Sequence, residues 1–378
     1  MRVSQRVQSI KLSGIRKMFE LVGSKTINFG IGQPDFQPPP KAIKALANAA
    51  REGWNKYTST YGIPELREKI AEYFLSKYCD YTGENILITI GGSHALYIAI
   101  MSLIDKGDEV LVPDPGFVLY APHVTLANGK PVYYTLRIEN DFRPDIEELK
   151  NLINKKTKAI IVNSPNNPTG GMLEREDVKA IADLAEDYDF YIISDEVYNV
   201  FVYEGKHVSF LEYSDRVLYP MSFSKIYAMT GWRIGFLAGP KEFIDQAMKL
   251  SYYTIACPSA PMQRALLDII GDPEVEEYVR NMISEFKMRR DYVFKRLSEI
   301  PHITVSKPKG AFYVLPKYDL KIPSEELAMK ILNEKDVAVT PGSAFGPHGE
   351  YHFRISFATS MRQLEIGLNR LYEFFSSL

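Results

Sequence analysis

Lys225 stands in a sequence context that could turn a lysine amine into a nucleophile. It follows an apolar run, lies beside Ser222 and Ser224, and is soon followed by Gly231-Trp232-Arg233. A lysine is ordinarily a solvated surface charge, but burial among aromatic residues lowers the pKa of the ammonium group and yields a free amine. Such an amine attacks carbonyl carbons and forms a Schiff base. The segment therefore predicts Schiff-base chemistry at Lys225.

Other residues with useful chemistry follow apolar runs elsewhere in the chain. Gly91-Gly92-Ser93 opens an apolar helical pattern, and such a turn presents free N–H groups and the positive end of a helix dipole to a phosphate. Taken alone, this turn could equally be a tight connection that binds nothing. A Schiff base with an aromatic aldehyde phosphate also needs a carboxylate for the ring nitrogen and donors for the ring oxygen. Residues that could complete such a site come after other runs: Phe117, Asn167, Asp195 and Tyr198.

Six short apolar runs must place these residues at one edge of a sheet. The runs alternate with helical patterns, and this alternation predicts βα units with a mainly parallel sheet. In open α/β sheets, ligands bind outside the carboxyl ends of the strands, which is where these residues stand. The predicted strands cover residues 86–90, 109–113, 159–163, 190–194, 217–221 and 234–238.

The chain after residue 273 has a different pattern. Residues 275–300 carry apolar side chains at near-helical spacing, which predicts one long connecting helix. Beyond it, short strands over 311–315 and 353–357 mix with two helices. We therefore expect an α/β fold with a smaller α+β domain. The expected divisions are an arm and part of the small domain over 1–44, a large domain over 45–280, and the rest of the small domain with the linking helix over 281–378.

The composition excludes several classes of protein. Of the 378 residues, 46% are hydrophobic and 24% are charged, which is near the globular average and argues against a disordered or membrane protein. Lys+Arg 45 against Asp+Glu 47 gives a net charge of −2, so nucleic acid is not an expected partner. Cys79 and Cys257 form no disulfide framework or zinc motif, and the chain does not begin with the apolar core of a signal peptide. We expect a cytoplasmic protein.

Six segments together resemble a known family. In chain order they are Gly32-Gln33-Pro34-Asp35-Phe36, Tyr57 with Gly62-Ile63-Pro64-Glu65-Leu66-Arg67, Asn166-Asn167-Pro168-Thr169-Gly170, Ser194-Asp195-Glu196-Val197-Tyr198, the Lys225 segment and Phe353-Arg354-Ile355-Ser356. Nearly the whole chain resembles the fold-type I pyridoxal-phosphate enzymes, specifically the class I and II aminotransferases related to aspartate aminotransferase. The resemblance implies a seven-stranded sheet between helices and pyridoxal 5′-phosphate as cofactor. It also implies a ping-pong transfer of an amino group between an L-amino acid and a 2-oxo acid.

The resemblance implies catalytic roles for Lys225, Asp195 and Tyr198. Lys225 resembles the lysine that forms the Schiff base with the cofactor and then moves the proton between substrate and cofactor. Asp195 resembles the carboxylate that keeps the pyridine nitrogen protonated. Asn167 and Tyr198 resemble the pair that hydrogen-bonds the phenolate oxygen of the cofactor.

A second set of residues is implied for the cofactor phosphate. One member, Tyr57, would reach across from a second subunit, which implies a homodimer with shared active sites. The implied ligands within one chain are the backbone of Gly92 and Ser93, the hydroxyls of Ser222 and Ser224, and Arg233.

Two more residues are implied to contact the ring and the substrate. Phe117 resembles the aromatic residue that stacks on the ring, with core packing as the alternative. Arg354 resembles the arginine that receives the substrate's α-carboxylate in a planar fork of two bonds, with a salt bridge at a strand end as the alternative. The backbone of Gly32 and the side chain of Asn167 would help to bind the substrate.

Two other functions stay open on the sequence. The same fold and cofactor could serve a lyase or synthase, for example in C–S β-elimination, because one carbanion can react in several ways. A cofactor-sensing regulator that does no catalysis is less expected, because no helix-turn-helix segment precedes the fold.

The motifs do not fix the donor amino acid. One subgroup of aspartate aminotransferases has a lysine after the glycine pair for the distal carboxylate, and this chain has Ser93 there. Phe19, Tyr61 and Phe117 could line a pocket for aromatic or aliphatic side chains. We expect a broad range of amino acids, with glutamate and 2-oxoglutarate as one pair.

The histidines indicate no metal site. His348 and His352 are four residues apart, but Pro347 and Gly349 break any helix that would bring them to one face. His94 follows the glycine turn, where it could lie near the phosphate or be packed or solvated without a role.

Overall fold

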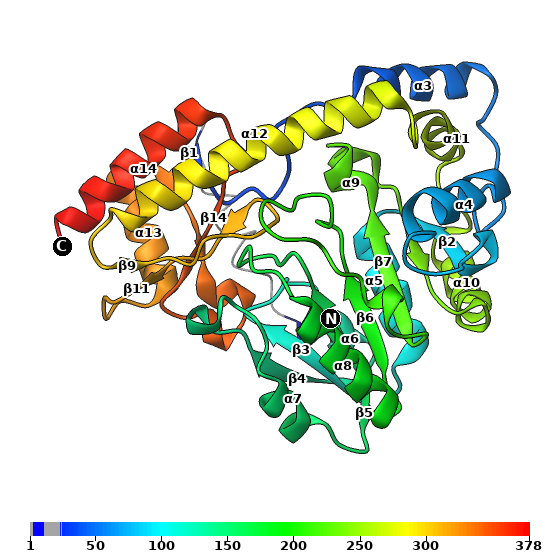
Figure 1. Cartoon of the computed structure of the whole chain (residues 1–378), viewed down its shortest axis with the longest axis horizontal. Coiled ribbons are helices and arrows are strands. Elements are labelled where there is room, and N and C mark those ends of the chain that lie inside the picture. Colours follow the sequence, from blue (N-terminus) through cyan, green and yellow to red (C-terminus); the bar gives the residue numbers. More distant parts are fainter. Residues whose placement is uncertain (1–2, 11–22, 24) are drawn as a thin grey trace.

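Figure 1 shows the chain as a computed structural model, which describes residues 3–10, 23 and 25–378. One part of the molecule is a sheet between helices. The long helix α12 (Pro273–Ser298) runs from this part to a second group of short strands and helices. Within the described residues, no helix is long and apolar enough to cross a membrane.

The large sheet has seven strands and one direction dominates. Strand β8 runs antiparallel to both of its neighbours, and every other neighbouring pair is parallel. In spatial order the strands are β2 (Ile86–Thr89), β8 (Gly235–Ala238), β7 (Val217–Ser222), β6 (Tyr191–Asp195), β5 (Thr157–Asn163), β3 (Glu109–Asp114) and β4 (Lys130–Thr135). The mainly parallel α/β sheet expected from the sequence is confirmed.

Six of these strands match the six predicted runs to within two residues at either end. The seventh, β4, has no counterpart among the runs. It lies at the edge of the sheet, its first four residues are exposed or half-buried, and Pro131 lies within it. An edge strand of this kind lacks the continuous apolar run that marks a strand buried on both faces.

Apolar side chains fill the space on both faces of the large sheet. In β2, Ile86 and Ile88 belong to one buried cluster and Leu87 to another, as the alternation of side chains along a strand requires. The helices of this part are α3 (Pro40–Arg51), α4 (Pro64–Ile70), α5 (Gly92–Leu103), α6 (Tyr120–Leu126), α7 (Ile146–Leu152), α8 (Arg175–Asp187), α9 (Phe223–Ile226), α10 (Lys241–Ile255) and α11 (Ala260–Ile269).

Another apolar cluster fills the second part; it includes Phe286 of α12 and extends to Tyr198 and Phe201 of the large part. Strand β14 (Phe353–Ser356) lies between β10 (Tyr313–Val314) and β13 (Thr340–Pro341), antiparallel to both. The strand β1 (Ile27–Asn28) from the start of the chain pairs in parallel with β12 (Val337–Ala338). The remaining elements are α1 (Gln5–Gln8), β9 (Ile303–Thr304), β11 (Lys317–Tyr318), α13 (Ser324–Lys335) and α14 (Met361–Ser376).

Candidate active site

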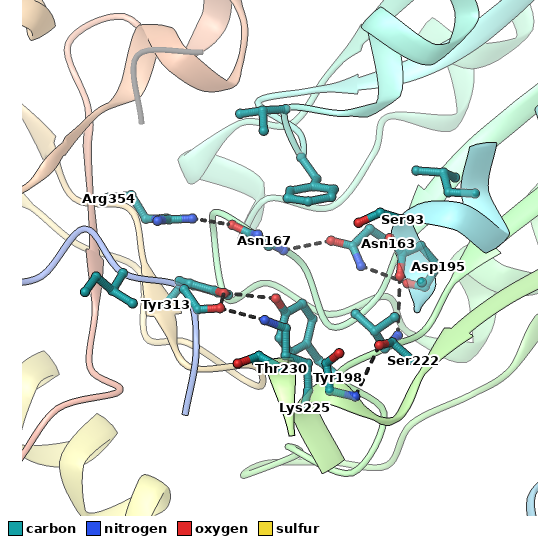
Figure 2. A pocket seen from close by; sticks show the side chains of 18 of the residues that line it. Ser93, Asn163, Asn167, Asp195, Tyr198, Ser222, Lys225, Thr230, Tyr313 and Arg354 are labelled. Carbon is teal, nitrogen blue, oxygen red and sulfur yellow. Dashed lines mark hydrogen bonds between the residues drawn. The ribbon is translucent and has the colours of Figure 1, made fainter. Parts of the chain in front are cut away.

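A cavity of about 620 Å³ lies at the carboxyl ends of the central strands, between the large sheet and the second part. It brings together twelve residues singled out in the sequence, from segments far apart in the chain, and Figure 2 shows several of them. These residues are Gly32, Gly92, Ser93, Phe117, Asn167, Asp195, Tyr198, Ser222, Ser224, Lys225, Arg233 and Arg354.

Lys225 lies in α9, which begins directly after β7 ends. Its Nζ donates a hydrogen bond of 2.6 Å to the carbonyl oxygen of Gly32. Burial, reinforced by the positive charges of Arg354 and Arg233, lowers the pKa of Lys225 to about 8. Near neutral pH, a useful fraction of this lysine is therefore the free amine that a nucleophile or general base requires.

Asp195 is the last residue of β6 and is buried. One of its carboxylate oxygens accepts a hydrogen bond of 2.7 Å from the hydroxyl of Tyr120, and the other accepts one of 3.4 Å from the N–H of Val197. Burial raises the pKa of Asp195 to about 6, against these two bonds, which lower it. A buried carboxylate of this kind is suited to bind a cationic N–H group, because the opposite charge offsets the cost of burial.

The turn between β2 and α5 lies beside Arg233 and Ser222, since a Cβ on Gly92 would be 3.1 Å from the Cβ of Ser222. Gly91 has a φ of +86°, and a Cβ there would lie 2.9 Å from a guanidinium nitrogen of Arg233. The Oγ of Ser224 is buried and has no hydrogen-bond partner within the described part of the chain. A cation, an unpaired hydroxyl and a helix start at one end of the cavity are suited to an anion such as a phosphate.

Arg354 lies in β14, and its guanidinium group points toward Asn167 (Figure 2). Its two terminal nitrogens donate to the side-chain oxygen of Asn167 at 3.0 Å and to the carbonyl of Gly30 at 2.6 Å. Its guanidinium carbon lies 4.6 Å from the ring centroid of Tyr313 and 4.9 Å from that of Phe345. With the hydroxyl of Thr340 at 3.5 Å, the partners among the described residues are an amide, a carbonyl, a hydroxyl and two rings, and none is the carboxylate of a strand-end salt bridge. The planar group is thus held in a fixed orientation at the cavity wall.

Tyr198 and Asn167 belong to two separate groups of hydrogen bonds that line the cavity (Figure 2). The hydroxyls of Tyr198 and Tyr313 are 2.9 Å apart, and Tyr313 donates to the carbonyl of Gly32 at 3.3 Å. Burial raises the pKa of both phenols, so each keeps its proton to donate. Asn163 accepts from the N–H of Asn167 at 2.8 Å and donates to the carbonyl of Asp195 at 2.8 Å.

Three residues of these two groups were not assigned to a site from the sequence. Asn163 ends β5, so the rule that ligands gather at strand ends could have found it. Tyr313 lies in the short strand β10 of the second part, and nothing in its local sequence distinguishes it from a core aromatic. Tyr120 is buried in α6 and reaches Asp195 only through the fold.

Some expected site residues lie away from the cavity, and Gly32 lines it with a different partner from the one expected. Tyr57 is 90% exposed and does not line the cavity of its own chain. The carbonyl of Gly32 bonds Lys225, while the carbonyl that bonds Arg354 belongs to Gly30. Tyr61 donates to Asp245 and is not among the residues lining the cavity, and Phe19 lies outside the described residues.

Comparisons with known proteins agree with this geometry. Residues 24–371 match the family model of aminotransferase class I and II. The chain is 43% identical to an aspartate aminotransferase of Pyrococcus horikoshii over 98% of its own length and 96% of that protein. It is 39% identical to aromatic-amino-acid aminotransferase 2 of Thermococcus litoralis, over 98% and 97% of the two chains. Among solved structures, aspartate aminotransferase from Thermus thermophilus with maleate has a TM-score of 0.94 and 35% identity, covering 99% of this chain and 100% of that one.

The match over nearly the full length confirms the family and the fold-type I architecture expected from the sequence. The relatives are named as aminotransferases, and they give no support to the lyase alternative. The chain therefore belongs to the class I and II aminotransferases and moves an amino group between an amino acid and a 2-oxo acid.

Proposed function

We propose that this aminotransferase uses pyridoxal 5′-phosphate, on which its family depends, and that glutamate and 2-oxoglutarate form one of its substrate pairs. The observation that carries the proposal is the meeting of Lys225, Asp195 and Arg354 around one cavity. An amine with a pKa of about 8, a buried carboxylate and an oriented guanidinium are the groups that this chemistry needs.

The residues around the cavity fit the cofactor. The buried Oγ of Ser224, which lacks a partner within the described residues, is positioned with Arg233 to receive a phosphate. In the proposal Asp195 binds the ring nitrogen, Asn167 and Tyr198 bind the ring oxygen, and Phe117 covers the ring. The remaining phosphate ligands are the backbone of Gly92 and Ser93 and the hydroxyl of Ser222. When bound, the cofactor supplies an aldehyde for the amino group and a conjugated ring that withdraws electrons.

The chain's own residues then bind, orient and move protons. Arg354 holds the α-carboxylate of the amino acid by two parallel hydrogen bonds, assisted by Asn167 and the backbone of Gly32, and this fixes the direction of the Cα–H bond. Lys225 takes the proton from Cα as a free amine and returns it, so its lowered pKa serves this step directly. Asp195 stays ionised next to the positively charged ring nitrogen.

The apolar part of the cavity lining supports a broad choice of amino acids. Ile31, Leu96, Val118 and Val197 contribute apolar surface to the cavity. Among the described lining residues, the cations are Lys225, Arg233 and Arg354, and each already has a role above. Apolar burial would therefore contribute to binding of aliphatic and aromatic side chains.

The exposed aromatic face around Tyr57 supports a homodimer with shared sites. Tyr57 and Tyr253 are 90% and 85% exposed. The segments on which they lie are joined, because Thr60 donates to the carbonyl of Ala256 at 2.8 Å. In the proposal this face meets a second copy, and the partner's Tyr57 completes the phosphate site.

The domain limits and the location remain part of the proposal. The divisions at 1–44, 45–280 and 281–378 are supported by the apolar cluster that Ile27 shares with Val337, because it joins the start of the chain to residues after 281. A cytoplasmic location is supported by Cys79 and Cys257, which are both free cysteines.

The first experiment is the absorption spectrum of the purified protein with cofactor, before and after glutamate is added. Wild type should show the visible band of the lysine-bound cofactor, and glutamate should shift that band as the amino group is taken up. Lys225→Ala should lack the band before glutamate is added, whereas the exposed control Lys249→Ala should behave as wild type. A wild-type protein that shows no band with added cofactor would contradict the proposal, and a band that ignores glutamate would exclude glutamate as the donor.

A further inference from the structure

His94 has no role in the reaction described above, yet it lies directly beside the turn at the phosphate end of the cavity. It is in the first turn of α5 and is 8% exposed. Its ring has a partner on each side. Nδ1 lies 3.3 Å from the backbone nitrogen of Ile90, and Nε2 lies 3.4 Å from the hydroxyl oxygen of Thr254 in α10.

These partners determine which ring nitrogen carries the proton. A backbone N–H only donates, so Nδ1 must accept with its lone pair and Nε2 must carry the proton. The hydroxyl of Thr254 accepts from Nε2 and donates a hydrogen bond of 3.0 Å to the carbonyl of Leu250. Burial lowers the pKa of His94 to about 4, so the ring is neutral near pH 7 and can make both bonds.

The hydrogen bond from Ile90 to His94 joins the residue that follows β2 to the first turn of α5. Strand β2 ends at Thr89, so the N–H of Ile90 lies just beyond the sheet. Gly91 then takes a positive φ, and its carbonyl accepts from the N–H of Ala95 at 3.2 Å inside the helix. His94 thus connects the residue before the glycines to the helix after them, and Thr254 holds the ring in place from α10.

We propose that His94 is a positioning residue that holds the Gly91-Gly92-Ser93 turn in the shape that receives the cofactor's phosphate. The inference rests on the proposed function, because it requires a phosphate at this turn. His94 itself need not touch the phosphate, since it acts through the backbone of the turn.

The test compares the affinity of the cofactor-free protein for pyridoxal phosphate and for pyridoxal, which lacks the phosphate. The ratio of the two dissociation constants isolates the contribution of the phosphate end. In His94→Gln the longer side chain puts its amide at the place of Nε2 and leaves Ile90 without its acceptor. We expect the dissociation constant for pyridoxal phosphate to rise about tenfold, because one orienting hydrogen bond is lost, and that for pyridoxal to stay unchanged. The ratio of the pyridoxal constant to the pyridoxal phosphate constant therefore falls about tenfold.

His94→Asn is the matched control, because its amide oxygen can take the place of Nδ1 and accept from Ile90. Its ratio should stay within about twofold of wild type, while Thr254→Val, which only loosens the ring, should lose about threefold. Thermal unfolding of each cofactor-free variant checks that it folds. An unchanged ratio in folded His94→Gln overturns the inference, and so does an equal loss of affinity for both ligands. If His94→Gln does not fold, an unchanged ratio in Thr254→Val overturns it instead. A wild-type protein that binds both ligands equally would contradict the phosphate site itself, and with it the proposed function.

Discussion

At the scale of single residues, Asp195 is a carboxylate whose ionised form is disfavoured by burial. Burial raises its pKa to about 6, and the hydrogen bond from Tyr120 opposes that rise. In the cofactor-free protein the ionised carboxylate therefore costs stability near neutral pH. In the proposal, a cationic ring nitrogen would remove this cost on binding, so the burial that raises the pKa of Asp195 would also strengthen cofactor binding.

Asp195→Asn should make the cofactor-free protein more stable at pH 7 and abolish efficient transfer. A group whose pKa is raised by folding contributes stability at low pH, and this is lost as the pH rises through the folded-state value. Wild type should therefore lose stability between about pH 4 and pH 6 relative to the Asn variant, by up to about 3 kcal/mol. Urea unfolding across this range measures the difference. If the Asn variant is no more stable than wild type at pH 7, the ionised carboxylate of Asp195 does not cost stability, and the inference from its raised pKa is wrong.

Arg354→Lys should weaken amino-acid binding and leave cofactor binding intact. A lysine cannot form two parallel hydrogen bonds to a carboxylate or stack between Tyr313 and Phe345 as the guanidinium does. We expect the KM for glutamate to rise about 100-fold. Steady-state kinetics measure this rise, and titration of the cofactor serves as the control. An unchanged KM would mean that the α-carboxylate binds elsewhere.

At the scale of elements, the turn between β2 and α5 is the proposed phosphate site, where backbone N–H groups rather than a single side chain would bind the phosphate. Its geometry requires a residue without Cβ at position 91, because φ is +86° and Arg233 approaches closely. The end of β2, Gly91 and the start of α5 therefore determine the shape of this turn together.

Gly91→Ala should lower the affinity for the cofactor by more than tenfold and also destabilise the fold by about 1–2 kcal/mol. The added Cβ would displace the guanidinium of Arg233, which is the flexible partner in this contact. Gly53→Ala is the matched control, because Gly53 has a φ of +92° but no atom within 4 Å of an added Cβ. The control should lose similar stability and keep wild-type affinity. Equal affinities in the two variants would show that the turn's shape does not matter for the cofactor.

At the scale of the whole molecule, the cavity exists only where the two parts of the chain meet. Lys225 comes from the large sheet, Arg354 from β14, and the Gly30 and Gly32 carbonyls from the segment after β1. A shared dimeric site would extend this arrangement across subunits, because the exposed Tyr57 cannot serve the cavity of its own chain.

Activity should return when subunits of Lys225→Ala and Tyr57→Ala, each of which impairs the site, are exchanged to form hybrid dimers. A hybrid of Lys225→Ala and Tyr57→Ala subunits has one site with both changes and one site with neither. An equal mixture should reach about a quarter of the wild-type activity if subunits combine at random. Activity measured before and after mild denaturation and refolding tests this. A mixture that stays inactive, or a protein that is fully active as a monomer, would contradict the shared site.

The sequence by itself determined the parts of this protein that depend on local pattern. Apolar runs marked six strands, and the polar residues after them marked Asn167, Asp195 and Lys225 before any contact was known. This succeeded because parallel strands place their carboxyl ends at one edge, so the position along the chain already implies a position in space. The exposed edge strand β4 was missed because it lacks an apolar run.

Only the tertiary structure decided which distant residues tune these groups. Lys225 and Gly32 are 193 positions apart, and His94 and Thr254 are 160 apart. Tyr120 and Tyr313 look like ordinary core aromatics until the fold brings their hydroxyls to Asp195 and Tyr198. The physical reason is that a hydrogen bond acts over about 3 Å, whatever separates its partners along the chain. Propensity and periodicity extend over only a few neighbouring residues, so they cannot specify such pairs.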